Sequence, residues 1–311
     1  MNVLTMRSLL TGLAIAAIAS GCAKTSTPLP ANTEQIADGV YLFRSGGERS
    51  LFLVSDAGVI VTDPINAGAA TAYRQAIAAI TDLPVKFVVY SHYHWDRVSG
   101  GKIFADEGAK FIAQERCAER FSVNPNPDVV TPDFTFTDYY ELALGDKSLE
   151  MFYFGPSHGD CMTVFLVQPA NMLQIGELVN PPRASFPDDP NVPYVKPHNL
   201  RQFFESLETL VAEKGINEVI ASAVHEIDDG KGGQTLSPAT APASIIHDQA
   251  MFWDAIYDTV FTAREEGNVG IDSFVKMKAI DQATFEPYDG YKKEDLPIIM
   301  RRFVGFADMG R

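Results

Sequence analysis

The chain alternates between short apolar runs and segments whose apolar residues recur at helical spacing. Runs rich in β-branched and aromatic residues, bounded by Gly and Asp, predict strands at 40–44, 50–54 and 58–62. Apolar residues at helical spacing from Ala69 to Ile80 predict a helix. The run from Val85 to Tyr90 is almost continuously apolar, which is typical of a strand buried on both faces.

The same patterns continue toward the C-terminus. We expect helices near 102–107 and at 115–121, and strands at 110–113, 133–137, 140–143, 148–153, 162–167, 172–175 and 218–223. A helix capped by Asn199 should end at Gly215, and another should span 247–266. Because the strands come in two batches, each with helices, the pattern indicates layered α/β structure.

The first residues have the pattern of an export signal. Arg7 is the only charged residue before a short apolar run, which is too short to span a bilayer as a permanent helix. Cys22 follows Ser20-Gly21, as in a bacterial lipobox, in which the chain is cut before the cysteine and the cysteine carries lipid. We expect an exported, periplasmic protein anchored to the outer membrane through Cys22, with a plain secretory signal as the alternative.

Charge and cysteine content limit the partners and leave one question open. The formal net charge is −15, so phosphate backbones are repelled and no nucleic-acid partner is expected. The same acidity also serves solubility. Besides Cys22, the chain has Cys117 and Cys161, which are either a disulfide or two buried thiols.

The stretch SHYHWDRVSGG at 91–101 carries the strongest chemical pattern. It directly follows the buried strand, and in an extended loop His92, His94 and Asp96 would project to the same side. Imidazole nitrogens and carboxylate oxygens are ligands that zinc accepts, and zinc takes about four of them. The remaining ligand candidates all lie at or near strand ends: His158, Glu177 and His225.

This arrangement resembles the metallo-β-lactamase superfamily. HxHxDR followed by two glycines, a histidine in a strand turn, an acidic residue after Gly and a late histidine match that family over roughly 36–230. The resemblance implies an αββα four-layer sandwich with one or two zinc ions at one edge. Manganese and iron are alternative metals. His92, His94 and His158 would hold the first ion, and Asp96, Glu177 and His225 the second.

The resemblance also implies supporting residues and a division of the chain. Asp63 corresponds to a buried aspartate that supports the metal loop, Asp160 is expected to act similarly near His158, and Arg97 lies beside the ligands. We divide the chain into a lipoprotein signal peptide (1–21), a tether (22–33), a metallo-β-lactamase-like domain (34–230) and a C-terminal helical extension (231–311).

Several positions depart from the family pattern. Position 177 is Glu, where Asp or Cys is usual, and Arg97 stands where many relatives have a histidine that holds the second metal. Arginine stays charged and cannot ligate. Ala223-Val224 replaces a usual glycine before the last histidine. Asn180 stands where one lactamase subclass has a lysine that grips the substrate carboxylate.

These observations predict a zinc-dependent hydrolase. Metal-activated hydroxide would attack a small-molecule ester, lactone, amide or thioester, and Asp96 would be the catalytic residue that orients the nucleophile and accepts its proton. One alternative is a β-lactamase acting on β-lactam antibiotics. The other is a non-catalytic, metal-holding accessory lipoprotein.

Overall fold

The computed structural model describes residues 30, 32–182, 184, 195–267 and 296–309. The expected signal peptide, Cys22 and nearly all of the tether lie outside the described residues, and β1 already begins at Thr33. Within the described part of the chain, no helix combines the length and the apolar character needed to cross a bilayer.

Seven strands form the first sheet, in chain order: β1 (Thr33–Ala37), β2 (Val40–Ser45), β3 (Glu48–Val54), β4 (Val59–Thr62), β5 (Val85–Val89), β6 (Lys110–Gln114) and β7 (Phe134–Phe136). The pairs from β1 to β4 are antiparallel, and those from β4 to β7 are parallel. The carboxyl ends of β4 and β5 therefore meet at one edge of this sheet, where a site can form.

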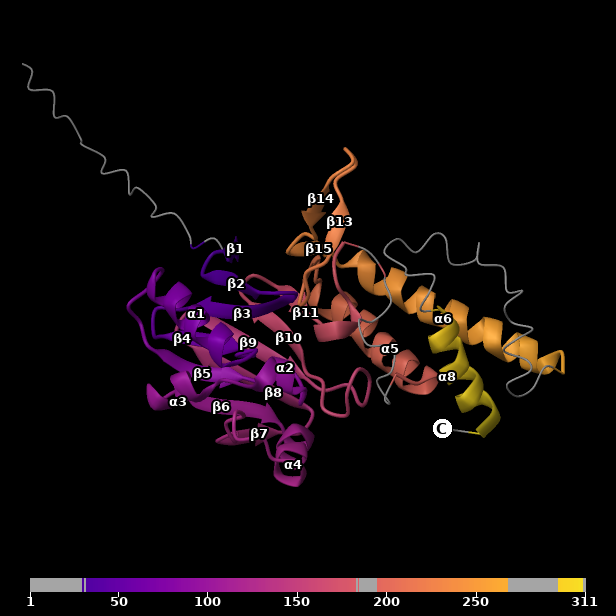
Figure 1. The fold of residues 1–311 in the computed structure, drawn as a ribbon, viewed down its shortest axis with the longest axis horizontal. Coiled ribbons are helices and arrows are strands. Elements are labelled where there is room, and N and C mark those ends of the chain that lie inside the picture. Colours follow the sequence, from indigo (N-terminus) through magenta and orange to yellow (C-terminus); the bar gives the residue numbers. More distant parts are fainter. Residues whose placement is uncertain (1–29, 31, 183, 185–194, 268–295, 310–311) are drawn as a thin grey trace, which may run out of the picture.

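The second sheet has six strands in the order β15-β12-β11-β10-β9-β8. Their bounds are β8 (Tyr139–Leu144), β9 (Lys147–Phe152), β10 (Val164–Gln168), β11 (Met172–Gln174), β12 (Glu218–Ile220) and β15 (Thr240–Pro242). A separate hairpin, β13 (Glu226–Asp228) and β14 (Gln234–Leu236), projects from the body (Figure 1). The β12 strand is shorter than expected because residues 222–224 turn toward the first sheet, where Arg49 N donates to Ser222 O.

Helices cover both outer faces, so the molecule has four layers, α-β-β-α, as the resemblance implied (Figure 1). The helices α1 (Ala67–Ala78), α3 (Lys102–Asp106) and α4 (Glu115–Val123) pack on the first sheet. The helices α5 (Pro197–Lys214), α6 (Ser244–Glu265) and α8 (Leu296–Met309) pack on the second. Alternation along β3 places Phe52 under the helices and Leu51 and Leu53 between the sheets.

Two boundaries in the second half differ from the sequence expectation. Helix α5 begins at Pro197 instead of after Asn199, since proline is tolerated in the first helical turn, and it ends at Gly215 with φ 63°. The region 231–311, expected to be a helical extension, also contributes β14 and β15 ahead of α6.

Cys117 and Cys161 form a disulfide. Cys117 lies in α4, and Cys161 lies just before β10. The bond closes a long segment of chain and joins a helix of the first layer to the second sheet. In the chain-entropy account, such a loop is worth roughly 4 kcal/mol.

Candidate metal centre

The stretch 91–101, which we call the metal loop, begins where β5 ends, and buried hydrogen bonds fix its first residues. Ser91 N donates to Asp63 Oδ1 at 2.8 Å, and Ser91 Oγ lies 2.9 Å from His92 Nδ1. Asp63 follows β4 and has a positive φ of 32°, which costs backbone energy and persists only where its surroundings enforce it. Asp63 thus contacts the loop that carries His92, and its role in supporting a metal site stays a prediction.

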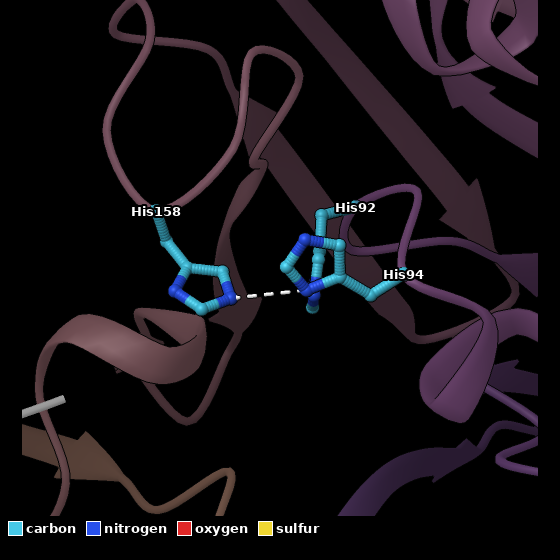
Figure 2. A group of neighbouring side chains, drawn as sticks. All are labelled: His92, His94 and His158. Atoms are coloured by element: carbon cyan, nitrogen blue, oxygen red, sulfur yellow. Dashed lines mark hydrogen bonds between the residues drawn. The ribbon is translucent and has the colours of Figure 1, made fainter. Parts of the chain in front are cut away.

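Three histidines converge at this edge (Figure 2). His92 and His94 come from the loop after β5, and His158 comes from the loop between β9 and β10. Their ligand atoms all lie within 4.8 Å of one another, and His94 Nδ1 is 3.2 Å from His158 Nε2. In a tetrahedral zinc site with bonds of 2.0–2.1 Å, two ligand nitrogens lie about 3.3 Å apart. The spacing therefore suits a metal ion.

The burial of His92 supports the same assignment. Its side chain is 1% exposed, and its Nε2 has no hydrogen-bond partner in the described part of the chain. Burial, together with the neighbouring His158, His94 and Arg97, holds the pKa of His92 well below its ordinary value. A neutral imidazole with an unsatisfied buried nitrogen fits a divalent ion, because metal ligands must be deprotonated and buried polar atoms need partners.

The loop that carries His158 is fastened to α4. Asp160 Oδ2 accepts a hydrogen bond from Arg120 Nε at 2.6 Å, and Asp160 O accepts one from Tyr153 Oη at 2.8 Å. The disulfide follows directly at Cys161. These contacts limit the positions that His158 can adopt, and the supporting role of Asp160 stays a prediction.

The backbone around Asp96 is helical, so the expectation of an extended loop through this residue is wrong. Trp95–Val98 forms the short helix α2, because Arg97 N and Val98 N both donate to His94 O, at 3.0 and 3.1 Å. Asp96 lies on the exposed side of this turn. Among the described residues, the group with ligand atoms within 4.8 Å of one another comprises the three histidines and does not include Asp96.

Arg97 points the other way, into the protein. It is 3% exposed and forms ion pairs with Glu177 and Glu48 through Nη2, while Nη1 donates to Ser222 O at 3.1 Å. Burial alone would lower the pKa of Arg97, but Glu177, Glu48 and Asp63 more than offset that effect and raise it. Glu177, in the 3-10 turn η1 (Gly176–Leu178) after β11, is therefore engaged by a guanidinium.

His225 lies beyond the point where the chain crosses back toward β3. Its backbone N–H donates to Ser237 Oγ at 3.0 Å, and its carbonyl accepts from Ser237 N at 2.7 Å. Its half-buried side chain does not belong to the three-histidine group among the described residues. Asn180 Oδ1 accepts from Ser222 N and Ala223 N, at 3.0 and 3.1 Å, so it anchors the segment that leads to His225.

A family model described as "Metallo-beta-lactamase superfamily" matches residues 45–215, more than half of the chain. The chain belongs to the metallo-β-lactamase superfamily. The matched range holds all three clustered histidines and Glu177, and it ends before His225.

Solved structures with this superfamily fold cover different shares of the chain. The metallo-β-lactamase from Pontibacter korlensis has a TM-score of 0.58 at 18% identity, over 71% of this chain and 98% of its own. The sec-alkylsulfatase Pisa1 from Pseudomonas sp. has a TM-score of 0.64 at 13% identity, over 88% of this chain and 50% of its own. These likenesses establish the fold.

One curated relative is similar in sequence. The 2,4-dinitroanisole O-demethylase subunit alpha from Nocardioides sp. (strain JS1661) is 27% identical over 150 residues, which are 47% of this chain and 46% of that protein. The match therefore spans about half the length of the relative.

Three residues that shape this superfamily site were not singled out for these roles from the sequence. Ser91 connects Asp63 to His92, and its position directly before the first histidine was the available clue. From the sequence, Asn180 was considered only because it stands where one lactamase subclass has a lysine, yet its amide oxygen accepts hydrogen bonds from two backbone N–H groups. Glu48 pairs with Arg97 from β3, and no local pattern marks it.

Proposed function

We propose that the protein is a zinc-dependent hydrolase of a small-molecule ester, lactone, amide or thioester. The convergence of His92, His94 and His158 carries this proposal, because their nitrogens have the spacing and burial of a metal ligand set. When bound there, a zinc ion supplies a Lewis acid that makes water nucleophilic near neutral pH. Manganese or iron is an alternative occupant that metal analysis would identify.

The chain's own residues then divide the work. With its proton on Nδ1, His92 donates to Ser91 Oγ and turns the Nε2 lone pair toward the site. Asp63 holds Ser91 N and so keeps this loop in register. The carboxylate of Asp96, two residues after His94 on the exposed side of α2, accepts the proton of the attacking water.

The substrate panel follows from this chemistry and from the relatives. The name of the Nocardioides relative describes removal of a methyl group from oxygen in 2,4-dinitroanisole, and Pisa1 is named as a sec-alkylsulfatase. We therefore include an activated aryl ether and a secondary alkyl sulfate beside carboxylic esters, lactones, amides and thioesters. A β-lactam completes the panel and tests the β-lactamase alternative. In that alternative the substrate carboxylate would be bound without the lysine that one lactamase subclass has at this position, because Asn180 stands there and its side chain holds Ser222 N and Ala223 N.

The first test compares turnover of the zinc-loaded wild type, Asp96→Asn and the control Asp82→Asn. Asp82 is exposed in the turn before β5. We expect Asp96→Asn to lower kcat by about 10²–10⁴-fold with little change in KM, since it removes a proton acceptor used in the transition state. Asp82→Asn should match the wild type.

Two outcomes would argue against this role or this function. Equal losses in kcat and substrate affinity would contradict a role for Asp96 in stabilising the transition state. A folded, zinc-loaded protein that turns over no member of the panel would favour the metal-holding accessory lipoprotein. Removal of zinc by chelator, and the variant His92→Ala, should abolish any activity.

We also propose that the protein is exported and anchored by lipid on Cys22. The signal-like N-terminus and the Cys117–Cys161 disulfide support this, because disulfides persist mainly in oxidising compartments. In a bacterial host, the wild type should incorporate labelled fatty acid and sediment with outer membranes. Cys22→Ser should lose the label and its membrane association, and an unlabelled wild type would contradict the lipid anchor.

A further inference from the structure

The geometry points to a centre that holds a single metal ion, with the guanidinium of Arg97 in the place of a second cation and Glu177 as its counter-ion. This inference rests on the proposed metal function, because it concerns how many ions that site takes. It departs from the sequence expectation that Asp96, Glu177 and His225 hold a second ion.

The first step concerns Glu177, whose carboxylate is already used. It forms an ion pair and a hydrogen bond with Arg97 Nη2, and the two side chains are 11% and 3% exposed. A buried charged pair in contact is costly to separate, because removing one partner leaves the other charge without compensation. To ligate a metal, Glu177 would have to give up this partner.

The second step concerns charge at the same place. Arg97 contacts Glu177 and Glu48 and lies in the field of Asp63, so the protein itself places one positive charge among these carboxylates. Nη1 donates to Ser222 O, which fixes the guanidinium from a further side. A dication brought next to the guanidinium would be repelled by its positive charge in surroundings of low dielectric constant.

The third step concerns the ligands that remain. Without Glu177, the expected second set is reduced to Asp96 and His225, whereas zinc takes about four ligands. Asp96 lies on the exposed side of α2. The backbone leading to His225 is held by Arg49, which donates to Ala223 O and Ser237 O, both at 2.6 Å. Two ligands on separately anchored segments make a weak site.

The experiment counts zinc on the full-length protein by equilibrium dialysis and elemental analysis, with a cobalt(II) absorption titration as a second readout. We expect one ion per chain and a cobalt endpoint at one equivalent. Glu177→Gln should also bind one ion. Glu48→Gln, which removes the other carboxylate on the same guanidinium, is the matched control and should behave in the same way.

The converse variant is Arg97→His, which removes the guanidinium, releases Glu177 and adds an imidazole at the position where many relatives have a histidine that holds the second metal. We expect its zinc content to rise from one toward two ions per chain. If circular dichroism shows that this variant does not fold, the double variant Arg97→His with Glu48→Gln takes its place in the test. The second substitution removes the Glu48 carboxylate, which would otherwise be left without the guanidinium.

The outcomes separate this inference from the proposed function. Two tightly bound ions in the wild type, with one lost in Glu177→Gln, would overturn the single-ion centre and leave the metallo-hydrolase intact. If the folded wild type bound no ion and gave no cobalt spectrum, the result would contradict the proposed function as well. One ion in the wild type and still one in a folded Arg97→His would overturn the role given to Arg97.

Discussion

Asp63, Ser91 and His92 form a short chain of hydrogen bonds that sets the orientation of one metal ligand. Asp63 is buried, and its carboxylate accepts a hydrogen bond from Ser91 N, while the side chain of Ser91 contacts His92 Nδ1. Burial raises the pKa of Asp63 from 3.8 to about 6, although Arg97 and the Ser91 hydrogen bond oppose that shift. The protein keeps a destabilised carboxylate here because it positions the loop.

That pKa predicts how stability depends on pH. Because the pKa of Asp63 is about 6 in the folded protein and ordinarily 3.8, ionising this group costs folding free energy as pH rises between these values. In metal-free protein, raising the pH from 4 to 7 should therefore lower wild-type stability relative to Asp63→Asn by about 2 kcal/mol. Urea denaturation at several pH values with chelator present measures this difference, and parallel curves would contradict it.

At the scale of an element, the turn after α2 depends on a close approach between backbones. Gly100 has φ +84°, and its N–H donates to Asp128 O at 2.8 Å. A Cβ at this position would lie 2.2 Å from the carbonyl carbon of Asn66, the residue that caps α1. The glycine after HxHxDR thus allows the metal loop to pack directly against the start of α1.

We therefore predict that Gly100→Ala is strongly destabilising. The variant combines an unfavourable φ with a backbone clash, which together cost about 2–5 kcal/mol. Gly108→Ala is the matched control, because Gly108 has φ +92° but open space around the added Cβ, so only the conformational cost of about 1–2 kcal/mol applies. Urea midpoints compare the two variants. Equal losses would show that the start of α1 yields to the methyl group.

The elements also show what sequence pattern can and cannot predict. The buried strand β5 and the amphipathic helix α5 were predictable, because apolar periodicity reports which side of an element is buried. The histidines were recognisable as ligands from their spacing and strand-end positions. The capture of Glu177 by Arg97 was not, because it joins residues 80 apart in the sequence. The helical turn at Asp96 was missed because the alternation of His92, His94 and Asp96 suggested an extended backbone, whereas Arg97 N and Val98 N both donate to His94 O.

At the scale of the whole molecule, the C-terminal helices share a core with the sandwich that carries the three histidines. Phe303 of α8 stacks on Trp253 of α6 with ring centroids 6.1 Å apart, and both belong to the cluster that includes Phe203 of α5 and Val164 of β10. Strand β15, just before α6, hydrogen-bonds to β12. This continuity indicates that the described helices and the sandwich unfold together.

The two tryptophans of the chain offer a direct test of this cooperativity. Trp95 lies in α2 beside the metal loop, and Trp253 lies in the core under α8, so each reports on one end of the molecule. In a Trp253→Phe background, where Trp95 is the remaining tryptophan, Phe303→Ala should lower the unfolding free energy reported by Trp95 by about 3–5 kcal/mol. In a Trp95→Phe background, the fluorescence of Trp253 should also report a loss of unfolding free energy, each loss being measured against its own background. If Phe303→Ala shifts the transition seen by Trp253 and leaves the one seen by Trp95 in place, the helical layer is a separate unit.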